Sequence, residues 1–72
     1  MKNYKLILGQ NIRKNRKDRQ LSQEKLAEIS SLHRTYIGSI ERGERNICLE
    51  NMILISNALD IKLSTLLEGI ED

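Results

Sequence analysis

The feature that most constrains this chain of 72 residues is the spacing of a few residues between Gln23 and Ile40. The pattern is Gln-x3-Ala-x3-Ser-x5-Ile-x2-Ile, and Glu-Arg-Gly follows it directly. This spacing predicts two short helices that cross over a tight turn. Ala27 is expected where the helices approach most closely. Ile37 and Ile40 are three residues apart, so they share one face of the second helix and supply its packing surface.

The opposite face of the second helix is polar. It carries residues that the pattern gives no reason to bury: Arg34, Thr35, Gly38, Ser39 and Arg42. A helix whose apolar face packs against the protein and whose exposed polar face carries hydrogen-bond donors is suited to the major groove of DNA. The sequence therefore predicts a DNA-binding surface on this helix.

At these residues the chain resembles the phage-repressor type of helix-turn-helix protein, also called the lambda-repressor-like or XRE family. The resemblance extends from about Leu8 to Gly69. Residues 21–27, Leu-Ser-Gln-Glu-Lys-Leu-Ala, are similar to the first motif helix of the family. Residues 34–46, Arg-Thr-Tyr-Ile-Gly-Ser-Ile-Glu-Arg-Gly-Glu-Arg-Asn, are more specifically similar to the controller proteins of restriction-modification systems. The resemblance implies an all-α fold of five helices with the helix-turn-helix at helices 2–3, about residues 22–42.

Composition agrees with one small helical domain over residues 1–72. The chain has no Pro, Phe or Trp and only two Tyr, so its core must consist of Leu, Ile, Met and Ala, which favours helices. A chain of this size buries only about 60% of its unfolded surface. Burial of further apolar surface in a dimer would therefore help to stabilise it.

The apolar pattern predicts where the helices lie. The first is expected from residue 2 or 3 to 18, the second from the N-cap Ser22 to residue 29 or 30, and the third from residue 34 to about 42. Gly43 is expected to close the third helix in the left-handed conformation. The fourth begins near 49, and the fifth runs over about 63–68 and ends at Gly69. Residues expected to point inward from the last two helices are Leu49, Met52, Ile55, Leu59, Leu66 and Leu67.

Two residues depart from the family pattern. Ser31 lies where the family usually has a glycine in the turn, because the backbone there is left-handed; a serine in that conformation costs on the order of 1 kcal/mol. His33 lies where Ser, Thr or Asp commonly caps the third helix. A neutral imidazole can accept a backbone N–H, although less well than those residues. The alternative is that His33 points toward a phosphate.

The charges are segregated along the chain. Residues 1–45 contain eleven Lys or Arg and five acidic residues, a net charge of +6, whereas residues 46–72 contain one Lys and five acidic residues, a net charge of −4. Charge runs usually only solvate helix surfaces, but here the basic half contains the helix-turn-helix. A polyanion is therefore expected to bind the N-terminal half.

The predicted base contacts come from the polar face of the third helix, beginning at its first turn. Arg34 can donate to O6 and N7 of a guanine, a contact worth roughly 1–3 kcal/mol of discrimination. Thr35 can present its methyl group to thymine or its hydroxyl to a phosphate. Tyr36 has two readings of equal weight: covering the core edge, or contacting a phosphate or thymine. Ser39 can donate to a base or a phosphate, and Gly38 would allow close approach of the backbone to DNA.

Other residues are expected to hold the DNA backbone. Gln23, at the first turn of the second helix, is similar to the family residue that fixes this helix end on a phosphate. Arg45 and Asn46 should reach the sugar-phosphate backbone, as the controller resemblance implies, and Arg42 can join them.

Arg16 and Glu41 have a structural reading. The family resemblance implies that they pair and bridge the first helix to the end of the third. If the pair is partly buried, loss of one partner should cost up to about 3–5 kcal/mol; if it is exposed, the cost is nearer 0–1 kcal/mol.

A dimer would place two recognition helices about 34 Å apart on a palindrome. Residues 49–70 are the expected dimerisation region. Leu54 is an apolar residue outside the inward stripe of the fourth helix, and with Ile61, Thr65 and Ile70 it could form the dimer patch. The alternative is that Leu54 is a lone exposed leucine, which is common.

Enzymatic function finds little support. The chain has no Gly-rich phosphate loop and no Cys/His cluster with metal-ligand spacing, and lone residues such as His33 and Cys48 are more often structural than catalytic. Cys48 is expected to be semi-buried. Neither a cofactor nor a metal is expected. One cysteine favours a reducing cytoplasm, and the longest apolar run, residues 52–55, is far shorter than a membrane span.

These observations predict a homodimeric transcription regulator that binds a palindromic operator in double-stranded DNA. The controller resemblance implies timing of restriction-modification genes, and RNA polymerase is the further partner considered. The alternatives are a phage-type repressor, or an antitoxin that acts mainly by protein–protein interaction. The antitoxin reading is weakened because only Glu71-Asp72 would be left as a tail for toxin binding.

Overall fold

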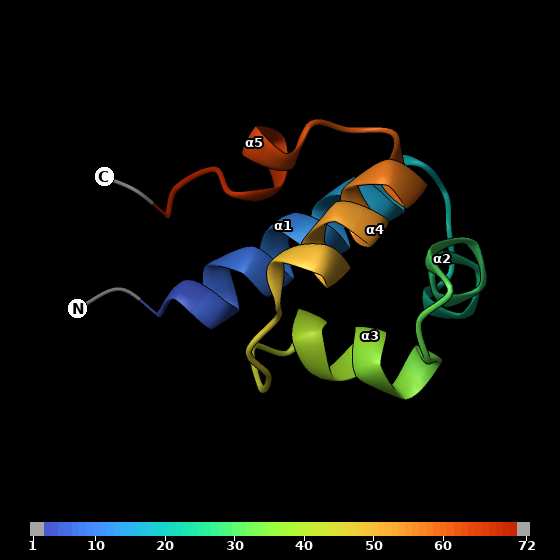
Figure 1. Cartoon of the computed structure of the whole chain (residues 1–72), viewed down its shortest axis with the longest axis horizontal. Helices are drawn as coiled ribbons and strands as arrows, with labels where there is room; N and C mark the ends of the chain where they lie inside the picture. The colour runs from blue at the N-terminus through green and yellow to red at the C-terminus, as the bar shows by residue number, and fades with distance from the viewer. Residues whose placement is uncertain (1–2, 71–72) are drawn as a thin grey trace.

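The computed structural model describes residues 3–70, and these residues form five α-helices without a strand. The predicted all-α fold is confirmed. In Figure 1, α3 lies on the lower side of the molecule and α5 on the upper side, with α1 and α4 between them. The elements are α1 (Tyr4–Asp18), α2 (Gln23–Ser30), α3 (Arg34–Glu41), α4 (Leu49–Leu59) and α5 (Leu63–Leu66).

Side-chain caps fix the starts of the first three helices. The side chain of Asn3 accepts a hydrogen bond from the backbone N–H of Leu6 at 3.1 Å, so Asn3 is the N-cap and α1 begins at Tyr4, one residue after the later of the two predicted positions. The earlier position, Lys2, lies outside the described residues. Ser22 caps α2 and His33 caps α3, the latter through Nδ1, which accepts from the N–H of Thr35 at 3.1 Å. Both predicted caps are confirmed.

Two left-handed residues close the motif helices. Ser31 has φ 63° and ψ 28°, so the predicted strained serine in the turn is confirmed. Gly43 has φ +74° and follows the end of α3, as predicted. A Cβ at Gly43 would also lie 2.9 Å from Cα of Leu6 in α1. Glycine is therefore required there both by its conformation and by the close approach of α1.

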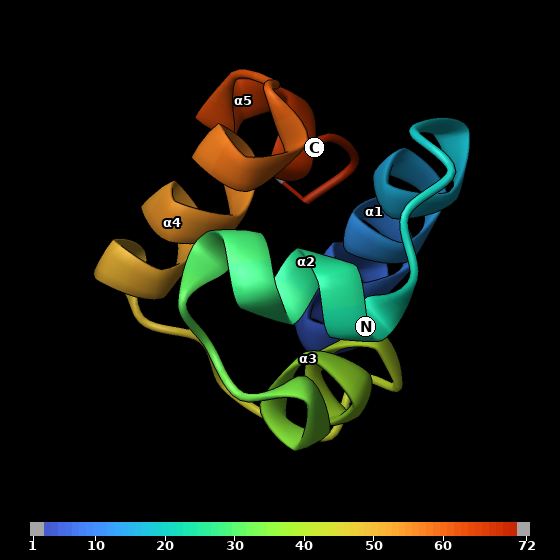
Figure 2. The ribbon, with the colours of Figure 1, turned by 90° about the vertical axis from the view of Figure 1, so that its right-hand side faces the viewer.

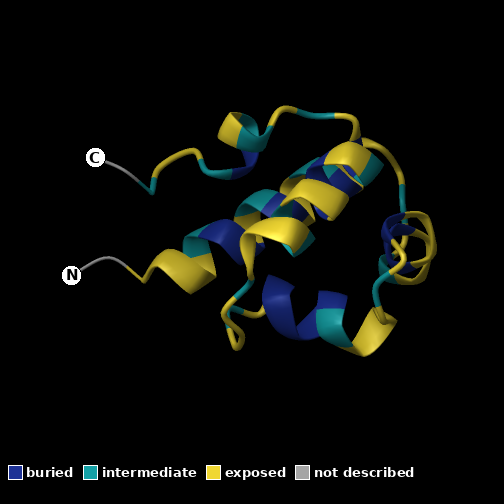
Figure 3. Cartoon of the chain, viewed as in Figure 1, coloured by how far each residue is buried: buried dark blue, intermediate teal, exposed yellow. Residues whose placement is uncertain are grey.

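The core contains side chains from all five helices, and it holds the inner face of α3. Its fully buried members, each no more than 1% exposed, are Ile12, Leu26, Ile37, Ile40, Ile55, Leu59 and Leu66. Ala27 is 5% exposed and lies in the same cluster. Figure 3 shows this core as buried segments on the facing sides of the helices. The predicted packing residues of the motif are therefore confirmed.

Three predictions about the C-terminal part were wrong. Leu49 is 59% exposed, because at 100° per residue it lies about 120° around the helix from Ile55. Cys48 is exposed at the N-cap position of α4. The fifth helix ends at Leu66 instead of residue 68, although Leu67 packs against the core as predicted. The side chain of Asn11 donates to the carbonyls at 66 and 68, so these groups need no further helical turn.

Candidate nucleic-acid interface

The recognition surface begins at the first turn of α3. Arg34 and Thr35 are exposed, whereas every residue from Ile37 to Glu41 is buried. Figure 3 shows the same change along α3, from an exposed beginning to a buried end. Figure 2 shows α2 crossing above α3, so the start of α2 lies close to this surface. The polar front is therefore shorter than the sequence predicted, and it is shared with the start of α2.

The predicted exposure of Ser39 was wrong. Ser39 is 8% exposed, and its hydroxyl donates to the backbone carbonyl of Tyr36 at 2.8 Å. The chain folds back after Gly43, and the N–H of Glu44 donates to the carbonyl of Ser39 at 3.0 Å. This hydrogen bond places the loop after Gly43 next to the backbone of Ser39. A contact between Ser39 and DNA stays a prediction, and the low exposure of this side chain does not favour it.

Gly38 was also expected on the exposed front but is buried. A Cβ there would lie 3.2 Å from Nη1 of Arg42 and 3.5 Å from Oε1 of Gln23. The ends of two polar side chains therefore cover the glycine in the free protein. The backbone can approach DNA at this point only if these side chains move.

A polar hollow of about 580 Å³ lies between the start of α2 and the front of α3. It brings together four of the residues predicted to contact DNA: Gln23, Arg34, Thr35 and Arg42. The other lining residues are Arg16, Ser22, Glu24 and Gly38. The positive end of the α2 dipole and two exposed guanidinium groups make this hollow a suitable place for a phosphate or a base edge.

Both arginines at this hollow are paired with exposed carboxylates. Arg34 Nη1 lies 2.8 Å from Glu24 Oε2, and Arg42 Nε lies 3.0 Å from Glu44 Oε2. The hydrogen bond from Arg42 lowers the pKa of Glu44, and the same bond raises the pKa of Arg42. Exposed ion pairs are weak, so a phosphate or guanine can compete for these guanidinium groups.

Tyr36 and Arg45 form a second group beside the hollow. Tyr36 is half-buried and packs against the core, which agrees with the core-covering reading. The guanidinium carbon of Arg45 lies 5.5 Å from the centre of the tyrosine ring, a cation–π distance. Arg45 is thereby held near the flank of α3 while it remains exposed.

Asn46 lies elsewhere. It lines a mainly apolar hollow of about 380 Å³, with Tyr4, Lys5, Leu8, Ile47, Met52, Leu67 and Ile70. The structure does not bring Asn46 into the polar hollow. It is exposed on the loop after α3, which keeps a backbone contact with DNA open as a prediction.

The predicted pair of Arg16 and Glu41 is confirmed. Arg16 Nε lies 2.7 Å from Glu41 Oε2 and Arg16 Nη2 lies 3.0 Å from Oε1, with the two side chains 10% and 3% exposed. Arg16 also donates to the carbonyl of Leu21 at 2.8 Å, and Gln23 donates to Glu41 Oε1 at 3.0 Å. This buried network ties α1 and the start of α2 to the end of α3, and it fixes the position of the Gln23 side-chain amide.

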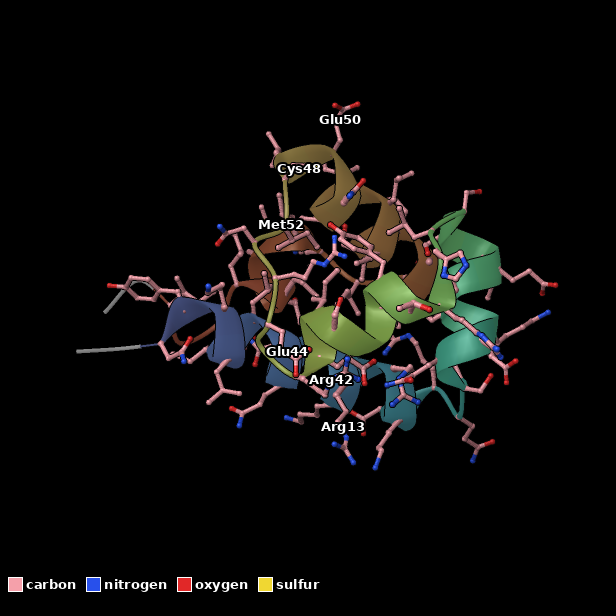
Figure 4. All side chains as sticks on the ribbon, turned by 90° about the horizontal axis from the view of Figure 1, so that it is seen from below. Arg13, Arg42, Glu44, Cys48, Glu50 and Met52 are labelled. Atoms are coloured by element: carbon pink, nitrogen blue, oxygen red, sulfur yellow. The ribbon has the colours of Figure 1, made fainter. Side chains whose placement is uncertain are left out.

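Figure 4 views the molecule from the α3 side. Arg13, Arg42 and Glu44 lie toward one edge of this face, and Cys48 and Glu50 lie toward the opposite edge, at the start of α4. Arg13 is exposed on α1, and the sequence analysis assigned it no role in DNA binding. Its place on the edge near Arg42 follows from the packing of α1 against α3, which helical periodicity alone does not reveal.

The predicted dimer residues differ in exposure. Leu54 is 40% exposed, whereas Ile61, Thr65 and Ile70 are half-buried, and both isoleucines pack against the core. The sequence analysis missed two further exposed apolar residues of α4: Leu49, and Ile53 at 41% exposure. The helical position of Ile53, opposite the inward stripe, was the signal that could have identified it.

Two further findings concern residues 3–70. None of their helices has the length and apolar character that crossing a membrane requires. No three or more His, Cys, Asp or Glu side chains in this range are grouped so that they could hold a metal ion.

Comparison with known proteins identifies the family. Residues 12–66 match the helix-turn-helix family. The chain is 54% identical over 63 residues to control protein C.SmaI of Serratia marcescens, an overlap of 88% of this chain and 75% of that protein.

Two solved structures have a similar fold. The restriction-modification controller protein C.AhdI from Aeromonas hydrophila superposes with a TM-score of 0.85 and 44% identity, over 86% of this chain and 94% of the other. The biofilm regulator SinR, solved in complex with DNA, gives a TM-score of 0.81 and 34% identity, over 85% and 98%. The resemblance predicted from residues 21–27 and 34–46 is confirmed. The chain therefore belongs to the helix-turn-helix family of transcription regulators, in the group of restriction-modification control proteins.

Proposed function

We propose that this protein is a sequence-specific DNA-binding regulator that binds a palindromic operator as a homodimer and controls expression of restriction-modification genes. The observation that carries the proposal is the polar hollow at the start of α2 and α3. It is lined by Gln23, Arg34, Thr35 and Arg42. The opposite face of α3 is buried in the core. Three separate parts of the chain, residue 23, residues 34–35 and residue 42, thus converge on one face.

Arg34 and Thr35 are the proposed base readers. Arg34 lies at the first position of α3, and its exposed guanidinium can leave Glu24 for the O6 and N7 atoms of a guanine. Thr35 is exposed beside it. Base contacts of this kind specify sequence, whereas phosphate contacts only position the protein.

The proposed backbone contacts surround these two residues. Gln23 and Arg42 line the same hollow, Arg45 is exposed beside Tyr36, and Asn46 follows on the loop. Each can donate to a phosphate oxygen. Neutralised phosphates release counterions, so operator affinity should fall with the logarithm of salt concentration.

The proposed dimer forms through residues 49–70. Leu54 is the most exposed of its predicted residues, and Ile61, Thr65 and Ile70 contribute only their accessible edges. Ile53 adds exposed apolar area on α4. A two-fold dimer of this kind would place two α3 helices about 34 Å apart, one turn of B-DNA.

The remaining proposals follow from this function. The whole of residues 1–72 would act as one domain, and the helix-turn-helix region would be about 22–42. RNA polymerase is a proposed further partner through the acidic half, where residues 46–72 have a net charge of −4. The protein would act in the cytoplasm and as a binding protein without catalytic activity.

The test is selection of duplexes from a random pool by the purified protein. The expected product is a two-fold symmetric sequence whose half-sites are centred about 10 base pairs apart, bound at least about 1,000-fold more tightly than a scrambled duplex of the same composition. Recovery of unrelated sequences, all bound with the affinity of the scrambled duplex, would contradict the proposal.

A further inference from the structure

We propose that Asn51 of α4 is a positioning residue for DNA binding, which acts by orienting the hydroxyl of Tyr36 as a donor toward a DNA phosphate. The inference rests on the proposed function. It adds a residue outside the helix-turn-helix to the binding machinery and assigns a direction to one hydrogen bond of the interface.

The geometry consists of one hydrogen bond between consecutive helices. Nδ2 of Asn51, in the first turn of α4, donates to the hydroxyl oxygen of Tyr36, in the first turn of α3, at 2.9 Å. Both side chains are half-buried, so the bond is partly shielded from water. The ring of Tyr36 packs against the core. The ring is therefore held in place, and only the hydroxyl can form hydrogen bonds with other groups.

The direction of this bond decides what the hydroxyl can still do. A tyrosine hydroxyl has one proton to donate and lone pairs that accept. Because Asn51 donates, it occupies a lone pair and leaves the proton free. Within the described part of the chain, the hydroxyl donates to no protein acceptor. The proton is therefore available to a group that can only accept, and a phosphate oxygen is such a group.

A charged donor lies over the ring of the same tyrosine. Arg45 places its guanidinium carbon 5.5 Å from the ring centre of Tyr36, and it is exposed. A guanidinium over an aromatic ring is attracted to the ring electrons, so the orientation of the ring also limits where Arg45 lies. Asn51 thus fixes one donor directly and a second donor through the ring. Together they form a site for one phosphate on the flank of α3.

The experiment is a double-mutant cycle on operator affinity. Asn51→Ala, Tyr36→Phe and the double variant are compared with the wild-type protein by fluorescence anisotropy on the selected operator duplex. Each single variant should lose about tenfold in affinity, the value of one hydrogen bond to a charged group. The double variant should lose no more than either single variant, because Asn51 acts only through the hydroxyl.

Charge and salt dependence separate this role from a purely structural one. Asn51→Asp keeps the size of the side chain but accepts the hydroxyl proton, so it should lose at least as much affinity as Asn51→Ala. Gln10→Ala and Gln10→Glu are the matched controls, because Gln10 is an exposed amide on α1, outside both the polar hollow and residues 49–70. Tyr36→Phe should leave the salt slope unchanged, since a neutral donor releases no counterion, whereas Arg45→Ala should reduce it by about 0.9.

The outcomes are distinct. Full operator affinity of Asn51→Ala, or an undiminished loss in the Tyr36→Phe background, would overturn the role of Asn51. A wild-type protein that shows no preference for any duplex would instead overturn the proposed function. Thermal unfolding of each variant reports folding, and if Asn51→Ala is unfolded, Asn51→Asp and Tyr36→Phe carry the cycle.

Discussion

At the scale of single residues, the buried pair of Arg16 and Glu41 does the most to hold the motif together. The carboxylate accepts from two nitrogens of Arg16 and from Gln23, and its side chain is only 3% exposed. Both charges are satisfied within the network. Removing one partner leaves the other buried without compensation, which costs far more than the intact pair contributes.

Glu41→Gln is therefore expected to lower the free energy of unfolding by about 3–5 kcal/mol, because Arg16 keeps its charge and loses its counterion. Urea denaturation followed by circular dichroism measures the change. Glu28→Gln is the matched control, since Glu28 pairs with Lys25 on the exposed side of α2 and loss of this pair should barely move the midpoint of unfolding. Equal midpoints for the two variants would show that the buried pair has no special role.

The same substitution, glycine to alanine, is expected to have opposite effects on stability at Gly9 and at Gly38. A Cβ at Gly9 would overlap the carbonyl oxygen of Ile40 and lie 2.8 Å from that of Glu41, which are backbone atoms that cannot move aside. Gly9→Ala should therefore destabilise the protein by at least about 2 kcal/mol. In Gly38→Ala the added Cβ meets only side-chain ends, Arg42 Nη1 at 3.2 Å and Gln23 Oε1 at 3.5 Å, so the stability of this variant should be unchanged or higher. Thermal unfolding tests both, and a stable Gly9→Ala protein would refute the close approach of α1 and α3.

At the scale of the elements, α2 contributes to the reading surface of α3 as well as supporting it. Glu24 at the first turn of α2 holds Arg34, and Gln23 covers Gly38. DNA must displace Glu24 from Arg34 before the guanidinium can reach a base. The carboxylate also lies in a hollow that a phosphate would approach. Glu24 should therefore oppose DNA binding.

Glu24→Gln is expected to raise affinity for operator and scrambled duplexes alike, by about two- to fivefold. Binding isotherms on both duplexes measure it, with Glu28→Gln as the control on the same helix outside the hollow. Weaker binding by Glu24→Gln would mean that Glu24 supports the position of Arg34 in the complex.

The starts of the helices and the turn between α2 and α3 could be predicted from sequence because they depend on neighbouring residues. Ser22, His33 and Ser31 act on backbone groups within four residues of themselves. The end of α5 could not be predicted, since Asn11, 55 residues earlier than Leu66, caps it. The burial of Ser39 likewise depends on the path of the chain after Gly43. Local signals fix local structure, and contacts between distant segments do not appear in periodicity.

The same distinction holds for the candidate site. Gln23, Arg34, Thr35 and Arg42 were predicted from the motif, and the structure brings them together. The pairing of Arg34 with Glu24 and of Asn51 with Tyr36 was not predicted, because each joins side chains of different helices. Only the packing of the helices shows which polar side chains meet.

At the scale of the whole molecule, the two halves of the chain have different charges and different proposed tasks. The basic half contains the hollow, and the acidic half contains the exposed apolar residues of α4. A small chain that buries little surface gains stability from association. A dimer through α4 leaves both α3 helices free for DNA.

Leu54→Glu is expected to shift the protein from dimer to monomer, because it places a charge in the apolar contact while the fold, in which Leu54 is 40% exposed, tolerates it. Sedimentation equilibrium measures the dissociation constant, which should rise at least tenfold, and operator binding should weaken with it. Ile29→Glu is the control, since Ile29 is 46% exposed on α2 outside the proposed dimer region. An unchanged dimer in the Leu54 variant would place the interface elsewhere.

The central claim is that the exposed first turn of α3 reads the base sequence. The most direct test compares Arg34→Ala with Lys14→Ala, which removes the same charge from the exposed side of α1, outside residues 49–70. The measured quantity is the ratio of affinities for the selected operator and a scrambled duplex at one salt concentration. Arg34→Ala should lower this ratio at least about tenfold, and Lys14→Ala should leave it unchanged. A wild-type ratio in the Arg34→Ala protein would contradict the account.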